Sequence, residues 1–327
     1  MIKNLILSGG ASKCIVYVGA IRALADLHML EHIEHFAGTS GGALLVSLLV
    51  LNYSIDEIEE LYYKLNLKDL IDIKGDSILR FFNDYGLDSG NTFIHLIKIV
   101  IKKKTGNAEI TFKELYELTH KHLIITGTCV EKECVEYFNH ILTPDMPVYL
   151  AIRISTCIPF VFNRVVYNNY TYIDGGFIEY FPIHYFSNIS ESLALGIENN
   201  SLHDTVLISS IENYVYKMLC GLYRANQENV LHTCTDNTII YKTDINGLDV
   251  LDIETKKNII TYGYAQTNNY FADTIIKNKL DSIINLIIKN EHENEHETGQ
   301  GTDQGVEQGV DQGVDQATDH IIETIKK

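Results

Sequence analysis

A serine at position 40 lies in the motif G-T-S-G-G (residues 38–42), between an apolar run at residues 33–37 and a helix-forming apolar run. A G-x-S-x-G motif in this setting predicts a nucleophile elbow, in which a strand, a sharp turn and a helix leave the serine hydroxyl exposed at the tip. A side chain next to the serine would collide with the strand or the helix, which explains the elbow glycines. These glycines are Gly38, Gly41 and Gly42. The alternative is a glycine-rich turn before an ordinary core helix.

A second glycine-rich turn follows the first apolar run of the chain. Residues 3–7 predict a short buried strand, the letters SGGASK occupy residues 8–13, and residues 15–30 have helical spacing. Such a turn places backbone amides at a helix N-terminus, where they can bind an anion. In an acyl hydrolase that anion is the oxyanion of the tetrahedral intermediate. The segment lacks both G-x-G-x-x-G and G-x-x-x-x-G-K-[ST], which disfavours a phosphate loop, and an ordinary strand-to-helix turn is the remaining alternative.

An aspartate follows another apolar run far downstream, in the letters YIDGG at residues 172–176. A carboxylate at the end of a strand can accept a serine proton directly and so act as a general base. The alternative for Asp174 is a plain Asp-Gly turn, a common use of this dipeptide. The choice between the two depends on whether Asp174 lies next to Ser40.

Taken in order, these three segments resemble the patatin-like phospholipase family. The pattern of that family is a glycine-rich oxyanion loop, a G-x-S-x-G serine and a D-G-[GA] aspartate. Residues 110–115 and 123–128 resemble the helix and strand before the aspartate, and residues 151–155 with Pro159 resemble the helix and proline turn. The resemblance covers residues 3–187 and rests on the ordered set of motifs.

The resemblance implies a lipid acyl hydrolase of the phospholipase A type with a Ser–Asp dyad and no histidine. Ser40 would be the nucleophile, and Asp174 would be the base that activates it. Attack on a glycerophospholipid or another acyl lipid would give an acyl-serine, which water hydrolyses to a fatty acid and a lysolipid. The residues of the oxyanion hole would be Gly9, Gly10 and Ala11, with Lys13 at the family's basic position. The turn glycines after the aspartate are Gly175 and Gly176. The resemblance implies no metal ion and no organic cofactor.

Three positions depart from the family pattern. Ala11 stands where a third glycine is usual, Cys14 where another glycine is usual, and Tyr180 where an asparagine is usual. An alanine still offers an N–H, but it costs about 1 kcal/mol or more if the loop requires a positive φ there. These departures leave open an alternative function, a catalytically impaired binding or scaffold protein with the patatin fold.

A Ser-His-Asp serine esterase is the rival mechanism. α/β-Hydrolases order their triad as serine, aspartate and histidine, and His184 follows Asp174 by ten positions. That separation is short for the arrangement, so the dyad is the preferred interpretation. Neither His120 with His122 nor the histidines near the C-terminus have the spacing of a zinc site, and we expect no metal.

Apolar runs typical of strands alternate with helical patterns along the chain. The runs lie at residues 3–7, 33–37, 123–129 and 165–173. Two helices begin with capping boxes, formed by Ser54 with Glu57 and by Thr111 with Glu114. The alternation predicts an α/β fold with a largely parallel central sheet, and the resemblance implies a patatin-like three-layer α/β/α arrangement. Ser40 and the oxyanion turn would then lie at the carboxyl ends of neighbouring strands.

We expect three parts along the chain: a catalytic core at residues 3–187, an extension packed on it at 188–290, and an acidic low-complexity tail at 291–327. The tail contains a four-residue repeat with too few apolar groups to form a core, so we expect it to be disordered. Residues 317–327 are expected to form a short helix that contacts an unknown protein.

The extension has its own predicted elements. Residues 211–227 and 262–289 have helical patterns, whereas residues 230–235 and 239–242 predict a hairpin. We expect these elements to shape or cover the acyl pocket.

The formal net charge is −17, of which −8 falls in residues 291–327, so the remainder of the chain is acidic as well. An acidic surface disfavours nucleic acid and strong electrostatic docking on anionic lipid. The lysines at 102–104 fit a solvated helix C-terminus, with contact to a membrane surface as the alternative.

The six cysteines form no C-x-x-C pair, and no signal-like leader precedes the first predicted strand. We therefore expect a reduced chain in the cytoplasm. An uncharged apolar stretch of about 18 residues, which would predict a membrane-spanning helix, is missing from the sequence. We expect a phospholipid or another acyl lipid as substrate, with any membrane contact made only at the surface.

Overall fold

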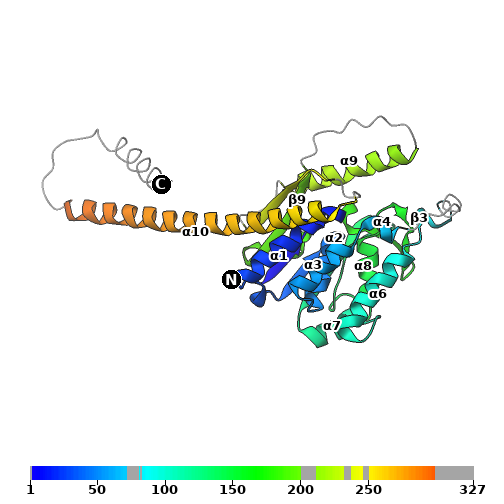
Figure 1. Cartoon of the computed structure of the whole chain (residues 1–327). Coiled ribbons are helices and arrows are strands. Elements are labelled where there is room, and N and C mark those ends of the chain that lie inside the picture. Colours follow the sequence, from blue (N-terminus) through cyan, green and yellow to red (C-terminus); the bar gives the residue numbers. More distant parts are fainter. Residues whose placement is uncertain are drawn as a thin grey trace. The chain divides into compact units, whose positions relative to one another are not determined.

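The computed structural model describes residues 2–71, 81, 83–199, 211–231, 237–245 and 250–298 (Figure 1). The chain divides into two compact units, Met1–Phe271 and Ala272–Lys327. The first unit holds the central sheet and the candidate site, and the second begins within a long C-terminal helix.

The strands and helices alternate along the first unit. The strands are β1 (Asn4–Leu7), β2 (His35–Gly38), β3 (Gly86–Asp88), β4 (His122–Cys129), β5 (Cys134–Phe138), β6 (Phe160–Phe162), β7 (Val165–Tyr167), β8 (Tyr170–Asp174), β9 (Ser192–Asn199) and β10 (Thr238–Thr243). The α-helices are α1 (Val16–Asp26), α2 (Gly41–Val50), α3 (Ile55–Lys64), α4 (Leu67–Leu70), α6 (Asn91–Thr105), α7 (Phe112–Thr119), α8 (Val148–Ser155), α9 (Ile211–Leu231) and α10 (Ile253–Thr298). The 3-10 helices are η1 (Ala11–Ile15), η2 (Leu30–His32), η3 (Gly175–Phe177), η4 (Pro182–Tyr185) and η5 (Ile189–Glu191).

The central sheet has the strand order β10-β9-β1-β2-β4-β8-β7, and β5 also pairs with β4. Every pairing from β10 to β4 is parallel, whereas β5, β7 and β8 pair antiparallel. Strands β3 and β6 form a separate parallel pair. Parallel strands joined through helices are typical of α/β proteins. The predicted α/β fold with a largely parallel sheet is therefore confirmed.

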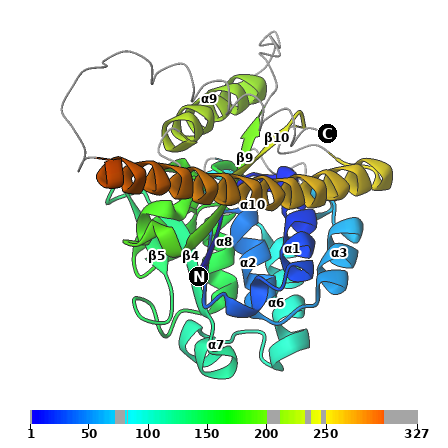
Figure 2. The same cartoon turned by 90° about the vertical axis from the view of Figure 1, so that its left-hand side faces the viewer.

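The two faces of the sheet are covered differently, because successive side chains of a strand point to opposite faces. In β1, Leu5 and Leu7 join the larger apolar cluster with residues of α1, α2 and α8, whereas Ile6 joins a smaller cluster. The smaller cluster includes Phe181 and Ile183 from the segment around η4. In Figures 1 and 2, α9 lies on the opposite side of β9 from α1 and α3.

The apolar run at residues 165–173 forms a hairpin rather than one strand. β7 and β8 pair antiparallel across a turn at Asn168 and Asn169, and these residues have positive φ angles of 48° and 66°. Two consecutive positive φ angles are the mark of a tight type I′ turn, in which asparagine is favoured. The run of apolar residues on both sides concealed this turn in the sequence.

Residues after position 187 add strands to the same sheet. β9 lies between β1 and β10, and β10 pairs parallel with β9. The predicted hairpin at residues 230–242 is therefore wrong. Its first arm begins in α9, residues 232–236 lie outside the described residues, and its second arm is the parallel strand β10.

The two helices predicted in the C-terminal part are present, and both extend beyond their predicted ends as α9 and α10. Because α10 continues to Thr298, residues 291–298 are helical, and the expected start of the disordered tail is wrong. The rest of the tail, with its expected short helix at 317–327, lies outside the described residues. The division into a core at 3–187 and an extension at 188–290 stays a prediction.

The first part of α10 packs directly on α1. A Cβ on Gly19 would lie 1.8 Å from the carbonyl oxygen of Ile260, and one on Gly263 would lie 2.1 Å from that of Val16. Glycine is therefore required at both positions for the two backbones to approach this closely. This packing fixes the start of α10 within the first unit.

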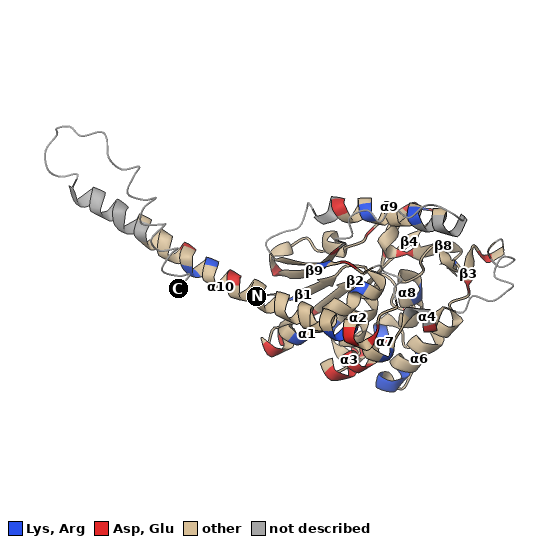
Figure 3. Cartoon of the chain, turned by 45° about the horizontal axis from the view of Figure 1, so that its top comes forward, with Lys and Arg blue, Asp and Glu red and all other residues tan. Residues whose placement is uncertain are grey.

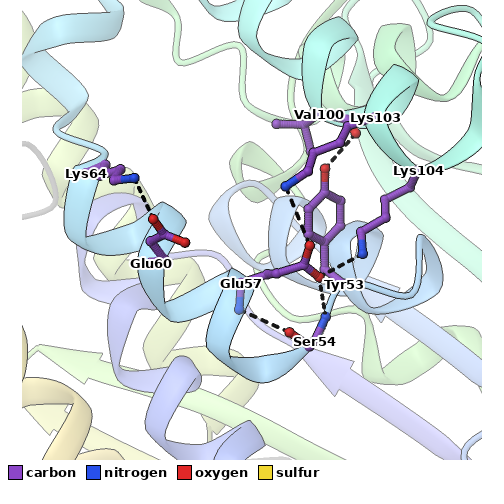
Figure 4. A network of polar contacts seen from close by, with 8 residues as sticks. All are labelled: Tyr53, Ser54, Glu57, Glu60, Lys64, Val100, Lys103 and Lys104. Carbon is purple, nitrogen blue, oxygen red and sulfur yellow. Dashed lines mark hydrogen bonds and ion pairs between the residues drawn. The ribbon is translucent and has the colours of Figure 1, made fainter.

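Both predicted capping boxes are present. At the start of α3, Glu57 N–H donates to Ser54 Oγ at 3.2 Å and Ser54 N–H donates to Glu57 Oε2 at 2.9 Å (Figure 4). The same reciprocal pair forms at the start of α7, between Thr111 and Glu114. Each box satisfies two amides that the helix itself leaves without partners.

The lysines at the end of α6 are not simply solvated. Lys104 Nζ lies 2.7 Å from Glu57 Oε2, and Lys103 Nζ lies 3.5 Å from Glu57 Oε1 (Figure 4). These ion pairs join α6 to the start of α3. The interpretation of this lysine run as a merely solvated helix end was therefore incomplete.

Charged residues are spread over the described part of the chain, and acidic ones gather on α3 (Figure 3).

Among the described residues, no helix combines the length and the apolar character that crossing a bilayer requires.

Candidate active site

The carboxyl ends of β2 and β8 meet on one edge of β4. Ile125 of β4 pairs with Gly38, the last residue of β2, and Gly127 pairs with Asp174, the last residue of β8. β5 also pairs with Ile125 and Gly127 of β4. Because a strand has two edges, β5 lies along one edge of β4, and β2 and β8 share the other edge. Because β2 runs parallel to β4 and β8 runs antiparallel, their ends point toward each other. The turn that contains Ser40 is thereby brought to Asp174.

Ser40 occupies a strained turn between β2 and α2. Its backbone angles are φ 54° and ψ −123°, a combination that residues other than glycine rarely adopt. Its N–H donates to Ser155 Oγ at 2.9 Å, which ties the turn to the end of α8. A Cβ on Gly38 would lie 2.7 Å from the backbone of α2, and one on Gly42 would lie 2.4 Å from the carbonyl oxygen of Ser8. Tight packing thus explains these two elbow glycines.

The Ser40 hydroxyl donates a hydrogen bond to Asp174, with 2.8 Å between Oγ and Oδ2. Both residues are buried, with 8% of Ser40 and 2% of Asp174 exposed. The other carboxylate oxygen, Oδ1, accepts a hydrogen bond from Gly176 N–H at 2.7 Å. Both carboxylate oxygens are therefore held in place, one of them by the hydroxyl of the elbow serine.

Burial raises the pKa of Asp174 from its ordinary value of 3.8 to about 7, because desolvation disfavours the charged carboxylate. The hydrogen bonds from Ser40 and Gly176 lower the pKa but do not cancel the effect of burial. A carboxyl group with a pKa near 7 populates both protonation states at neutral pH. Such a group can accept a proton and return it, as general acid–base chemistry requires.

The two glycines after the aspartate leave room for their neighbours. A Cβ on Gly175 would lie 2.2 Å from Thr126 Oγ1, and one on Gly176 would lie 3.0 Å from Asp174 Oδ1 and 3.1 Å from the ring of Tyr223. A side chain at Gly175 would therefore collide with β4 and displace Asp174 from its pairing with Gly127.

The first glycine-rich turn lies beside the elbow, because β1 pairs parallel with β2. The Gly9 N–H donates to the carbonyl oxygen of Tyr180 at 2.9 Å. This amide is therefore occupied in this structure, and its assignment to the oxyanion hole stays a prediction. Gly10 and Ala11 stand at the start of η1, where the first amides have no partner within the helix. The Tyr180 hydroxyl donates to the carbonyl oxygen of Ile197 at 2.9 Å and anchors the segment further.

The other departures from the family pattern also have structural consequences. Ala11 has φ 48°, in the left-handed region where alanine costs about 1 kcal/mol relative to glycine. Cys14 is fully buried, and its Sγ would lie 2.7 Å from a Cβ on Gly41. Burial raises the pKa of Cys14, whereas the charge of Lys13 on the same 3-10 helix lowers it. The thiol is thus a packing group rather than a nucleophile.

A cavity of about 100 Å³ opens at the elbow. Ala11, Ser40 and Gly41 line it, together with mostly apolar side chains from several elements. The apolar lining includes Ile15, Leu44, Leu65, Phe93, Phe162 and Leu251. The nucleophile candidate therefore faces a space suited to a hydrocarbon group.

Several residues of the site carried no recognisable motif. Ser155 lies within a segment that resembles the family, but its contact with the elbow amide is visible only in the structure. On α9, Asn226 Nδ2 donates to the carbonyl oxygen of Ile178 at 2.8 Å and holds the helix against the loop after Asp174. Tyr223 Oη is buried without a hydrogen-bond partner in the described residues. Burial raises the pKa of Tyr223, and the charge of Asp174 adds to this effect.

His184 does not complete a triad in the described structure. Its Nδ1 lies 3.5 Å from Glu179 Oε1, and 59% of its side chain is exposed. Within the described part of the chain it has no contact with Ser40 or Asp174. The geometry therefore favours the dyad over the Ser-His-Asp alternative.

An elbow serine at the carboxyl end of a strand and beside an apolar cavity is typical of serine acyl hydrolases with an α/β fold. Here the serine is hydrogen-bonded to a buried aspartate rather than to a histidine. The family model for patatin-like phospholipases matches residues 5–187. The chain belongs to this family.

Relatives extend the comparison beyond the family match. An uncharacterized protein of Acanthamoeba polyphaga mimivirus is 25% identical over 274 residues, which cover 80% of this chain and 91% of the relative. A probable lipid hydrolase of Invertebrate iridescent virus 6 is 33% identical over 183 residues, which cover 55% of this chain and 62% of the relative. The crystal structure of VipD from Legionella pneumophila shares the fold, with a TM-score of 0.58 and 18% identity, over 83% of this chain and 67% of VipD.

Proposed function

We propose that the chain is a lipid acyl hydrolase of the phospholipase A type, which cleaves fatty acyl esters through an acyl-serine at Ser40. The observation that carries this proposal is the 2.8 Å hydrogen bond from Ser40 Oγ to Asp174 Oδ2 beside an apolar cavity. Membership of the patatin-like phospholipase family supports hydrolase activity, and the relative named a probable lipid hydrolase supports a lipid substrate.

In the first step, Asp174 accepts the hydroxyl proton while Ser40 Oγ bonds to the ester carbonyl carbon. The carbonyl oxygen becomes an oxyanion, for which Gly10 and Ala11 offer amides at the start of η1. Gly41 offers a third, because it is the first residue of α2 and its N–H has no partner within the helix. Preorganised amides of this kind are each worth about 3 kcal/mol in acyl transfer.

In the second step, the protonated Asp174 returns its proton to the alcohol oxygen that leaves as the lysolipid. A water molecule then attacks the acyl carbon while Asp174 accepts one of its protons. The bond between the acyl carbon and Ser40 Oγ breaks, Asp174 returns the proton to Oγ, and the fatty acid is released. A pKa of about 7 for Asp174 supports both directions of proton transfer near neutral pH.

We propose that the part of the extension within the first unit, residues 188–271, completes the acyl pocket. Leu251 and Lys256 lie in this part of the chain and line the cavity together with Ser40, which supports that assignment.

We also propose that the protein is cytoplasmic and that it contacts membranes only at their surface. Co-sedimentation with vesicles tests the membrane contact.

The deciding experiment combines activity with labelling of the nucleophile. Purified protein should hydrolyse p-nitrophenyl esters and phospholipid vesicles and should react with a fluorophosphonate, and Ser40→Ala should remove both properties. Asp174→Asn should lose turnover, whereas Ser190→Ala, at an exposed serine, is the matched control and should retain both properties. Lipid analysis of the products should identify a fatty acid and a lysolipid.

A patatin-fold binding protein without turnover is the second candidate. The positive φ of Ala11 and the occupied amide of Gly9 favour it, because both weaken the oxyanion turn. Folded wild-type protein that hydrolyses no ester and leaves Ser40 unlabelled would exclude the first function and favour the second.

A further inference from the structure

A lysine from the C-terminal part of the chain lies in the wall of the candidate active-site cavity. Lys256, in the first turn of α10, is only 3% exposed and lines the same cavity as Ser40. Its Nζ donates to the carbonyl oxygens of Tyr63 at 3.0 Å and Leu65 at 2.8 Å, at the end of α3. A protonated lysine has three N–H donors, so these contacts leave one donor without a partner in the described part of the chain.

Capping the end of α3 does not explain why the ammonium group is buried. A lysine that serves only as a cap can bond to the last carbonyls of a helix while its charge stays in water. A buried charge is stable only when it is paired or hydrogen-bonded. Burial lowers the pKa of Lys256, and the charge of the exposed Asp69 raises it, but the two form no ion pair in the described structure. The cavity therefore offers a cation that lacks a direct counter-charge among the described residues.

A second polar group stands next to this lysine in the cavity wall. Asn66 directly follows Leu65, lines the cavity, and has a buried side-chain oxygen without a hydrogen-bond partner in the described residues. A side-chain amide can accept a hydrogen bond from a hydroxyl or donate one to an anionic oxygen. In this mostly apolar cavity wall, Lys256 Nζ keeps one N–H donor beyond its two hydrogen bonds, and the Asn66 side-chain amide carries N–H donors of its own beside the unpartnered oxygen. These N–H groups can donate to an anion, and we call this pair of residues the anion subsite.

We propose that the anion subsite binds the phosphate of a glycerophospholipid whose ester lies at Ser40, so that the enzyme prefers phospholipids to neutral acylglycerols. This inference rests on the proposed function and names the substrate class. The phosphate of a glycerophospholipid is joined to its esters only through the glycerol carbons. An ester at Ser40 therefore keeps the phosphate close to the same cavity. Lys256 lies outside residues 5–187, which the family model matches, whereas Asn66 lies inside them, so the C-terminal part of the chain supplies the cation of the subsite.

The experiment compares two soluble substrates that differ only in the phosphate headgroup. A short-chain phosphatidylglycerol and the corresponding diacylglycerol are hydrolysed below their micelle-forming concentrations, and the ratio of their kcat/KM values is measured. Lys256→Met should lower this ratio by about tenfold or more, because a charge-assisted hydrogen bond to phosphate is lost. Lys257→Met removes the same charge from an exposed neighbouring position and should leave the ratio at its wild-type value.

The outcomes separate recognition from a purely structural role. An equal fall in kcat/KM for both substrates, or an unchanged ratio in a folded Lys256→Met protein, would overturn the proposal. If Lys256→Met does not fold, Asn66→Asp provides the second test, since a carboxylate in the subsite should repel phosphate and also lower the ratio by about tenfold. An unchanged ratio in Asn66→Asp would then overturn it.

Two further results assign a failure to its cause. If inorganic phosphate inhibits diacylglycerol hydrolysis, and Lys256→Met removes that inhibition without changing the substrate ratio, the ligand is free phosphate and the headgroup assignment is overturned. Wild-type protein that hydrolyses neither substrate contradicts the proposed function itself. Hydrolysis of both substrates that depends on Ser40 but shows no effect of Lys256 contradicts only the present inference.

Discussion

Replacing Asp174 with asparagine is expected to abolish ester hydrolysis and, at the same time, to stabilise the fold at neutral pH. Burial raises the pKa of Asp174 from 3.8 to about 7. Between these values the native protein holds a proton that the unfolded chain releases, so the free energy of unfolding decreases as the pH rises through this window. Asparagine carries no charge and removes this part of the pH dependence.

The size of the effect follows from the pKa shift. A difference of about three pK units corresponds to about 4 kcal/mol at 1.36 kcal/mol per unit. Asparagine can keep both contacts of the carboxylate, since its oxygen can accept from Gly176 N–H and its NH2 group can donate to Ser40 Oγ. We expect Asp174→Asn to exceed the wild type in stability by about 2 to 4 kcal/mol at pH 8 and by about 0 near pH 4.

Urea unfolding of both proteins at several pH values between 4 and 8.5 measures this difference directly. Asp145→Asn, at an exposed aspartate, is the control and should follow the wild type at every pH. A stability difference between Asp174→Asn and the wild type that is the same at pH 4 and pH 8 would refute the buried, proton-binding carboxylate. A wild type more stable than Asp174→Asn at pH 8 would refute it as well.

The rate of p-nitrophenyl ester hydrolysis should report the same carboxylate: kcat/KM is expected to rise about tenfold per pH unit below about pH 7 and to level off above it, and a flat profile from pH 5 to 8 contradicts Asp174 as the base. Ala11→Gly should increase the free energy of unfolding by about 1 kcal/mol because the residue has φ 48°; urea unfolding that detects a loss instead disproves strain at this position. Ser155→Ala removes the bond to Ser40 N–H and should lower kcat by about tenfold, measured with the same ester; an unchanged kcat argues against this positioning role. His184→Ala should change kcat/KM by less than about twofold, and a loss of more than about a hundredfold favours the Ser-His-Asp mechanism.

Local motifs predicted the elbow and its glycines well, because the constraint on each is local. A serine between a strand and a helix must accept unusual backbone angles, and Gly38 and Gly42 have no room for a side chain. Capping boxes are similarly local, since both partners lie within one helical turn. The φ of Ala11 also agrees with the condition stated from sequence, under which alanine is strained.

Other features depend on partners that no local pattern identifies. Nothing near residues 238–243 indicates that β10 pairs parallel with β9 rather than in a hairpin. The amide of Gly9 is occupied only because Tyr180, far along the chain, presents its carbonyl oxygen there. Lys256 lines the cavity because Gly19 and Gly263 let α10 approach α1 backbone to backbone.

The sequence by itself determined which residues can form a dyad, since the chemistry of a hydroxyl and a carboxylate belongs to the side chains. It also determined where strands and helices alternate, because hydrophobic periodicity is a property of neighbouring residues. Only the tertiary structure decided that Ser40 and Asp174 meet, because strand register along β4 brings together residues separated by 134 positions. The same structure decided the pKa of Asp174, since burial depends on everything that packs around the carboxylate.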